Sequence, residues 1–305
     1  MKWTCLFLAA FVSLSAAASP STSAPQTAPA HDRQFWRDIA KNKYALPQGQ
    51  SAFPLAQELG SSLDSPDPEL RDDLAYSILD VWIVYRNYFS SPELISLLES
   101  WQSNLRSGIG ETSTDAVLKR SFSALCLAIL AERDLKSPFL GEARFRNLLE
   151  NALSYLKDER DLRGFDAVKG WIHATAHTAE LLAFLAANPL LKVEDQSRIL
   201  NAVSERLSSA QQIFTYGEQD RLANTVATIV ARKDFDAASF HQWLVNLDQA
   251  DRKVWNETPP NDFLLKTYQN NSYMLQALAA RLYAQPKTAV VSSALDEVAQ
   301  ILRKR

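Results

Sequence analysis

Between residues 63 and 79 the chain reads Leu63-Asp64-Ser65-Pro66-Asp67-Pro68-Glu69-Leu70-Arg71-Asp72-Asp73-Leu74-Ala75-Tyr76-Ser77-Ile78-Leu79. The Ser-Pro-Asp-Pro start signals a helix N-terminus, because proline suits the first helical turn and acidic residues there complement the helix dipole. Apolar residues then recur at helical spacing at Leu70, Leu74 and Ile78. The stretch therefore predicts a long amphipathic helix.

Similar signals recur along the chain and predict a mostly helical fold. Ser91-Pro92-Glu93-Leu94 repeats the start signal, and later helices are expected at about 113–135, 141–157, 193–209, 217–233, 236–249, 260–284 and 288–303. Only eight glycines occur in 305 residues, and no long run of Val, Ile and Thr alternates with polar residues, which argues against a β-rich fold.

The order of turn, Asp-Pro-Glu-Leu-Arg and Leu-Ala resembles the second helix of a HEAT-type repeat. We therefore expect an all-α fold of about a dozen helices. Their antiparallel pairs are predicted to stack as a HEAT-like α-solenoid or to close as an α/α toroid.

The N-terminal segment predicts export. Residues 1–18 combine a positive start with an apolar run that ends in small residues, which is typical of a secretory signal peptide. Residues 19–30 are rich in Ser, Thr, Ala and Pro, and are expected to form a disordered linker. No change in composition divides the remainder, so a single all-α domain is predicted over residues 31–305. The mature protein is expected to be periplasmic or secreted, with no transmembrane segment.

The charge and the motifs present exclude several familiar classes of function. A net charge of −3 provides no basic footprint for nucleic acid, so no nucleic-acid partner is expected. The chain has no Gly-rich phosphate loop, no Gly-x-Ser-x-Gly elbow and no Cys-x-x-Cys pair. The oligomeric state is left open by these observations.

The chemistry-bearing stretch runs Lys169-Gly170-Trp171-Ile172-His173-Ala174-Thr175-Ala176-His177-Thr178-Ala179-Glu180-Leu181-Leu182. At 3.6 residues per turn, His173, His177 and Glu180 fall on one face of a helix. Two imidazoles at this spacing can bind zinc, with Glu180 as a third ligand. In metalloproteases a Glu follows the first His directly, and here that residue is Ala174, so zinc-protease chemistry is not predicted.

Three interpretations of this helix face remain open. The histidines and Glu180 line a polar binding pocket, or they hold a metal ion, or they lock neighbouring helices together through hydrogen bonds. No cofactor is assigned, and zinc is a metal that His173, His177 and Glu180 could bind at this spacing.

Other parts of the chain supply candidate partners for this face. Arg71 or Asp72 shares a helix face with Tyr76, while Asp166 precedes the histidines and serves either the pocket or a turn. Arg221 belongs to the first turn of a later helix. The predicted ligand-binding residues are Arg71, Asp72, Tyr76, Asp166, Trp171, His173, His177, Glu180 and Arg221.

Three blocks together resemble a bacterial family known as domain of unknown function 2785. They are Arg71-Asp72-x-x-Ala75-Tyr76, Gly170-Trp171-Ile172-His173-Ala174-x-Ala176-His177-x-x-Glu180 and Glu218-x-Asp220-Arg221-Leu222-Ala223. The resemblance runs from about residue 60 to 285 and implies an all-helical, HEAT-like fold. It implies no activity, but it groups Arg71, Asp72, His173, His177 and Arg221 in one site.

Two functions are therefore predicted, and whether the protein is an enzyme is left open. The first is a binding module for a small polar ligand or a peptide, as curved helical arrays offer extended binding surfaces. The second is a hydrolase or lyase acting on a sugar or peptide, with His173, His177 and Glu180 as catalytic candidates, either as base or as metal ligands. A carboxylate from another helix within hydrogen-bond reach of either histidine would favour the enzyme.

Overall fold

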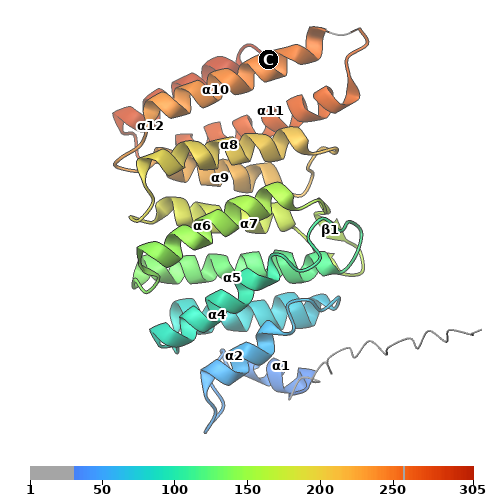
Figure 1. The fold of residues 1–305 in the computed structure, drawn as a ribbon, viewed down its shortest axis with the longest axis vertical. Coiled ribbons are helices and arrows are strands. Elements are labelled where there is room, and N and C mark those ends of the chain that lie inside the picture. The colour runs from blue at the N-terminus through green and yellow to red at the C-terminus, as the bar shows by residue number, and fades with distance from the viewer. Residues whose placement is uncertain (1–30, 257) are drawn as a thin grey trace, which may run out of the picture.

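The computed structural model describes residues 31–256 and 258–305, so the predicted signal peptide (1–18) and linker (19–30) lie outside the described residues. The described part is a stack of helices with one two-stranded hairpin (Figure 1), which confirms the all-α class. The α-helices are α1 (Arg33–Lys41), α2 (Ala52–Gly60), α3 (Ser77–Asp80), α4 (Ser91–Asn104), α5 (Ala116–Lys136), α6 (Gly141–Asp158), α7 (Ala174–Ala187), α8 (Val193–Ser209), α9 (Glu218–Val230), α10 (Ala237–Arg252), α11 (Asp262–Ala284) and α12 (Ala289–Leu302). The remaining elements are η1 (Glu69–Tyr76), η2 (Val81–Tyr85), η3 (Lys253–Asn256), β1 (Phe165–Asp166) and β2 (Gly170–Trp171).

The helices alternate between two layers. In one layer α5, α7, α9 and α11 pack side by side, and η2 packs against α5. In the other layer α8 lies between α6 and α10, while α4 packs against α5. Helices α1 and α2 stand at one end of the stack and α10 to α12 at the other (Figure 1), so of the two predicted forms the open stack is the one observed.

Helix α7 lies in the interior of the stack, where it packs against α5, α6 and α9. Its alanines let these neighbours approach closely, and its leucines fill the space between the two layers. The buried apolar side chains of α7 are Ala174, Ala176, Ala179, Leu181, Leu182, Ala183, Leu185 and Ala186. A helix apolar on nearly every side is expected in the interior of a helical stack.

The stretch from residue 63 to 79 departs from the regular α-helix that its sequence predicts. Residues 69–76 and 81–85 form π-helical turns, with the short α3 between them. Consistent with this wider spacing, the Ser77 hydroxyl donates to the carbonyl of Asp72, five residues earlier. Apolar periodicity does not distinguish turns that differ by one residue, so the sequence alone could not reveal the π-helical turns.

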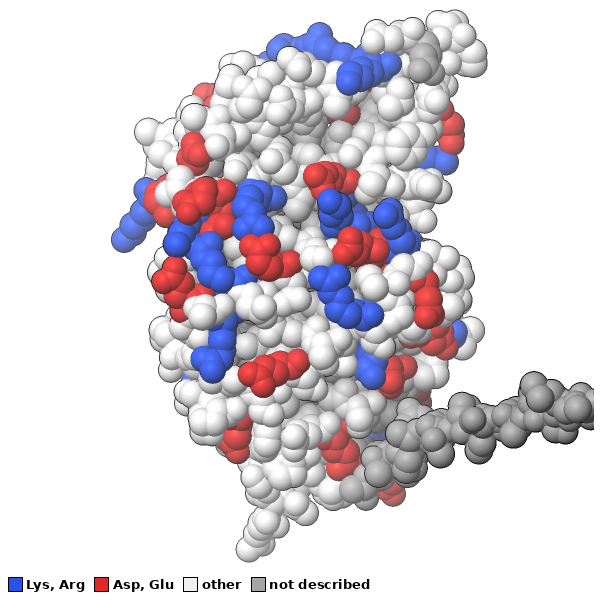
Figure 2. Space-filling model, in the orientation of Figure 1, with Lys and Arg blue, Asp and Glu red and all other residues white. Residues whose placement is uncertain are grey.

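No helix among the described residues is both long enough and apolar enough to cross a membrane. On the face drawn in Figure 2, Lys and Arg side chains are interspersed with Asp and Glu. That mixture fits the many ion pairs between neighbouring helices, such as Arg198 with Glu150 and Arg281 with Asp220.

Candidate functional site

The segment before α7 is a hairpin rather than the first turn of a helix. Its strands β1 and β2 pair antiparallel, with Asp166 opposite Gly170, and α7 begins only at Ala174. His173 is the N-cap of α7, with φ 47° and ψ 31° in the left-handed region. The prediction that His173 shares a helix face with His177 is therefore wrong, although both rings still face one cleft.

Backbone hydrogen bonds explain why the helix starts late. The N–H groups of Ile172 and His173 both donate to the carbonyl oxygen of Gly164, so the base of the hairpin satisfies them. Residue 164 must be a glycine for the hairpin to lie against Tyr216 and Glu218. A Cβ there would overlap the ring of Tyr216 and lie 2.7 Å from Glu218 Oε1. The hairpin therefore sets the position of His173.

Arg71 stabilises the hairpin through hydrogen bonds to its backbone. Its side chain is fully buried, and it donates from Nη2 to the carbonyl oxygens of Lys169, at 2.6 Å, and Trp171, at 3.2 Å. Asp72 Oδ1 lies 2.7 Å from Arg71 Nε, although the two atoms do not meet hydrogen-bond geometry. Burial raises the pKa of Asp72 to about 6, and the attraction of Arg71 only partly offsets this. Arg71 thus acts on the hairpin and Asp72 acts on Arg71, and neither residue lines the cleft.

Asp166 has the second of its two predicted roles, as a turn residue. Its Oδ1 accepts hydrogen bonds from the backbone N–H groups of Val168, at 2.8 Å, and Lys169, at 2.9 Å. These two bonds hold the pKa of Asp166 below its usual range. The residue closes the hairpin turn and is absent from the cleft lining.

The cleft itself has a volume of about 240 Å³ and is lined by residues of η1, α5, α7 and α9, together with His173. The lining combines polar and apolar side chains. The polar residues are Tyr76, Glu132, His173, His177, Glu180 and Arg221, and the apolar ones are Leu125, Ala128, Ile129, Ala176 and Phe184. Five predicted site residues thus meet here, namely Tyr76, His173, His177, Glu180 and Arg221.

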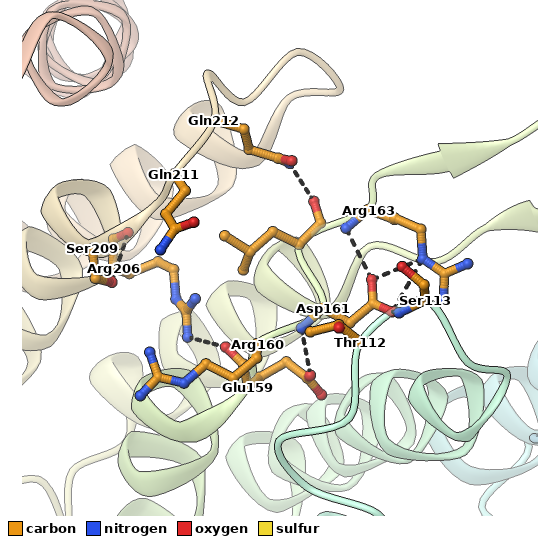
Figure 3. A pocket seen from close by; sticks show the side chains of 11 residues that line it. Thr112, Ser113, Glu159, Arg160, Asp161, Arg163, Arg206, Ser209, Gln211 and Gln212 are labelled. Carbon is orange, nitrogen blue, oxygen red and sulfur yellow. Dashed lines mark hydrogen bonds and ion pairs between the residues drawn. The ribbon is translucent and has the colours of Figure 1, made fainter. Parts of the chain in front are cut away.

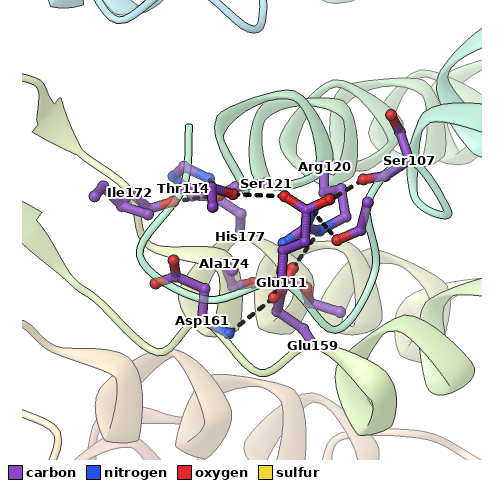
Figure 4. A network of polar contacts seen from close by, with 12 residues as sticks. Ser107, Glu111, Thr114, Arg120, Ser121, Glu159, Asp161, Ile172, Ala174 and His177 are labelled. Carbon is purple, nitrogen blue, oxygen red and sulfur yellow. Dashed lines mark hydrogen bonds and ion pairs between the residues drawn. The ribbon is translucent and has the colours of Figure 1, made fainter. Parts of the chain in front are cut away.

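His177 is held in one tautomer by Ser121. The Ser121 hydroxyl donates its single proton to the carbonyl of Ile172, so its oxygen accepts from His177 Nδ1 at 2.8 Å (Figure 4). The Nδ1 atom therefore carries the ring proton, and Nε2 has a free lone pair with no hydrogen-bond donor among the described residues. Burial, together with repulsion from His173, holds the pKa of His177 well below its usual range. A neutral ring thus presents a hydrogen-bond acceptor.

His173 is fixed by a different set of contacts. Its Nε2 lies 3.0 Å from the carbonyl oxygen of Tyr216, which can only accept, so Nε2 carries the proton. The Trp171 ring, 43% exposed, stacks on the imidazole with 4.4 Å between centroids. Burial holds the pKa of His173 below its usual range. Trp171 thus lies beside the cleft and orients His173.

The cleft lining also contains an ion pair. Arg221 Nη1 lies 2.6 Å from Glu180 Oε2, which joins α9 to α7 across the outer surface. Burial raises the pKa of the Tyr76 hydroxyl far above its usual value, so the group stays protonated and able to donate. The cleft therefore combines a neutral acceptor, a neutral hydroxyl and a compensated charge pair.

Two contributors, Ser121 and Glu218, were missed in the sequence. Ser121 lies in an apolar helix, and nothing in its neighbourhood marks it. Glu218 looks like an ordinary first-turn acid, but it is 2% exposed, and its Oε1 lies 4.0 Å from His173 Nε2. Burial raises the pKa of Glu218. Its only sequence signal is that it is the first residue of the third block of the family resemblance.

No group of three or more potential metal ligands converges among the described residues. The two histidine rings stand 5.7 Å apart, centroid to centroid, in an edge-to-face arrangement, and Glu180 is paired with Arg221. Zinc binding by His173, His177 and Glu180 therefore stays a prediction.

Comparison with protein families bears directly on the resemblance. The family model described as "Protein of unknown function (DUF2785)" matches residues 105–280. The chain belongs to this family. No curated protein and no solved structure matches the chain. The DUF2785 match includes His173, His177, Glu180 and Arg221, whereas Tyr76 precedes it and is contributed by the part of the chain outside the match.

Proposed function

We propose that the cleft binds a small polar ligand or a peptide segment through uncharged hydrogen-bonding groups. The observation that carries this proposal is the free Nε2 lone pair of the neutral His177, in a cleft that Tyr76, whose hydroxyl stays protonated, and apolar side chains also line. A ligand hydroxyl or amide N–H would donate to Nε2, and Tyr76 would donate to a ligand oxygen. The Glu180–Arg221 pair would orient the ligand at the rim.

The fold supports the proposed ligand binding by analogy. We propose that the two-layer open stack is HEAT-like, a type of array that offers extended surfaces to ligands. We also propose that residues 1–18 direct export and that the mature protein, a single domain over residues 31–305, acts in the periplasm or outside the cell. A ligand available there would be a sugar or a peptide fragment.

Two variants test the binding site atom by atom. His177→Asn keeps a donor near the position of Nδ1 for Ser121 but removes the Nε2 acceptor, while Tyr76→Phe removes one hydroxyl. His241→Asn, at an exposed histidine paired with Glu297 on another part of the stack, serves as the matched control. Saturation-transfer NMR with neutral mono- and disaccharides and N-acetylated dipeptide amides measures binding.

We expect at least one probe to bind the wild type and the His241→Asn control equally. Its signal should fall about tenfold or more with His177→Asn, because about 1.5 kcal/mol is a typical cost of one lost hydrogen bond. A panel in which no probe distinguishes wild type from His177→Asn would contradict the proposal.

A second candidate, a hydrolase or lyase acting on a sugar or peptide, rests on Glu218. This buried acid of raised pKa lies near His173 Nε2, as a catalytic acid would. At 4.0 Å it is outside hydrogen-bond reach, and no described carboxylate hydrogen-bonds to His173 or His177. Product formation from the same panel, lost in Glu218→Gln, would favour the enzyme over the binding module.

A further inference from the structure

A second cavity, of about 350 Å³, lies beside the loop that joins α6 to the hairpin (Figure 3). Its walls come from the turn before α5, the loop at residues 159–163 and the C-terminal end of α8 with the residues that follow. It shares no lining residue with the histidine cleft. The proposed function makes no use of this cavity.

Arg206 brings an unpaired charge to the cavity. The side chain belongs to α8 and is only 4% exposed, yet it forms no ion pair with any described carboxylate. Its one hydrogen bond to described residues runs from Nη2 to the carbonyl oxygen of Glu159, at 3.1 Å, and its buried Nε has no acceptor. A buried guanidinium without an ion-pair partner is costly, so this site is suited to an anion.

The acidic residues of the cavity are already engaged. Glu159 is 2% exposed and accepts from Arg120 Nε at 2.6 Å and Nη2 at 3.0 Å. Asp161 accepts from Arg163 Nη2 at 2.6 Å and from the Ser113 N–H at 2.9 Å. One buried carboxylate, Glu159, thus serves two buried guanidinium groups, those of Arg120 and Arg206, and it compensates the charge of Arg206 only in part.

Arg160 adds a second cation on the same side of the cavity. Figure 3 shows the Arg160 and Arg206 side chains together at one end and the Asp161–Arg163 pair at the other. Arg160 forms no ion pair among the described residues. A smaller neighbouring cavity is also lined by Arg160, Arg206 and Ser209, so the depression continues past the two arginines. Thr112, Ser209 and Gln211 add neutral hydrogen-bonding groups.

We propose that this cavity binds the phosphate group of a small organic phosphate, with Arg206 and Arg160 holding the phosphate oxygens. Two guanidinium groups with hydroxyl and amide neighbours suit a tetrahedral dianion better than a planar monocarboxylate. The volume exceeds that of one phosphate and falls within the range of ~300–1,000 Å³ that is usual for small-molecule sites. The organic part of the ester occupies the space toward Gln211.

Calorimetric titration with inorganic phosphate and with glycerol 3-phosphate, at constant ionic strength, tests this site. The variants are Arg206→Gln and the exposed Arg160→Gln. Arg198→Gln removes an arginine from the same helix α8, where it pairs with Glu150 outside the cavity, and is the matched control. We expect each probe to bind wild type and the Arg198→Gln control with the same affinity. Arg160→Gln should bind each probe at least tenfold more weakly, and Arg206→Gln should not bind either probe.

Three results would overturn the proposal. They are no heat of binding beyond that of sodium chloride, unchanged affinity in Arg160→Gln, and acetate binding as tight as phosphate binding. If Arg206→Gln does not fold, Arg160→Gln decides alone, because its exposed side chain makes no hydrogen bond to described residues.

Discussion

Arg71 Nη2 lies 2.6 Å from the carbonyl oxygen of Lys169, which is 98 positions further along the chain. The same guanidinium donates to the carbonyl of Ser65 at 2.8 Å and covers the ring of Phe122 at 4.5 Å. One buried side chain thus ties the start of η1 to the hairpin that positions His173. The family match begins after Arg71, so this tie joins the matched part of the chain to the part before it.

Arg71→Lys is expected to lower the free energy of unfolding by about 3–5 kcal/mol. The shorter Lys ammonium would stay buried, but it could not reach all the carbonyl oxygens that Arg71 contacts, those of Ser65, Lys169 and Trp171. Denaturant unfolding measures the loss. Arg37→Lys, at an exposed arginine paired with Glu69, is the control and should leave the free energy of unfolding nearly unchanged. Equal effects of the two substitutions would argue against the tie.

Ser121→Ala should release the tautomer of His177. Without the hydroxyl, Nδ1–H loses its acceptor, which costs about 1–3 kcal/mol for a buried group. Long-range ¹H–¹⁵N NMR of the imidazole should change from one Nδ1-protonated species to a mixture. Ser123→Ala on the same helix, which removes the acceptor of Asn104, should leave the His177 signals unchanged. A single unchanged tautomer in Ser121→Ala would contradict the assignment.

Gly170→Ala should destabilise the protein through two separable effects. The residue has φ +73°, and a Cβ there would lie 2.9 Å from Pro68 Cβ. Gly49→Ala shares the positive φ, +79°, but a Cβ there meets nothing within 4 Å. We expect a loss of about 1 kcal/mol at Gly49 and about 2–3 kcal/mol at Gly170, by thermal unfolding. Equal losses would show that the Pro68 contact is unimportant.

Asp80→Asn should stabilise the protein at neutral pH. Burial, with repulsion from Glu132, raises the pKa of Asp80 to about 6. The folded-state pKa thus exceeds the unfolded value near 3.9, so stability present at low pH is lost as the pH rises through about 6. Solvent screening of this half-buried group limits the gain to about 1 kcal/mol, or ~2–4 °C in Tm, at pH 7.5.

The gain from Asp80→Asn should shrink as the pH falls toward 4, because Asp80 is then protonated in the folded protein and so uncharged, as Asn is. Thermal unfolding at pH 4 and 7.5 measures it, with the exposed Asp73→Asn as control. A gain independent of pH would contradict the electrostatic cause.

Zinc content of purified protein tests the remaining metal prediction. Since Glu180 is paired with Arg221 and no described trio of ligands converges, we expect substoichiometric zinc in wild type. Stoichiometric zinc in wild type that is absent from the folded His173→Ala/His177→Ala variant would instead favour a metal-dependent hydrolase or lyase. Elemental analysis decides between them.

Much of the fold could be predicted because helix signals are local. The Ser90 hydroxyl pairs with Glu93 at the start of α4, as the Ser-Pro-Glu pattern predicts, and α8 spans the expected 193–209. The late start of α7 could not be predicted, because it depends on Gly164 lying against Tyr216 and Glu218, which are more than fifty positions away.

The site was predicted in part for the same reason. Polar residues in sequence blocks, such as His177 and Arg221, were identifiable, and they do share a cleft. Arg71 and Asp72 were grouped with them, but they support the hairpin through contacts that no local pattern encodes. Ser121 escaped notice because a buried serine has no sequence context that distinguishes it from packing.

The number of residues in the π-helical segment η1 determines the directions in which two of its side chains point. Arg71 points to the hairpin and Tyr76 to the cleft from the same eight residues. Deleting one residue between them would rotate everything on one side of the deletion by about a quarter of a turn about the helix axis. Either the anchor or the hydroxyl would then face away from its target. This segment should thus tolerate exchange of its other side chains more readily than insertion or deletion of a residue.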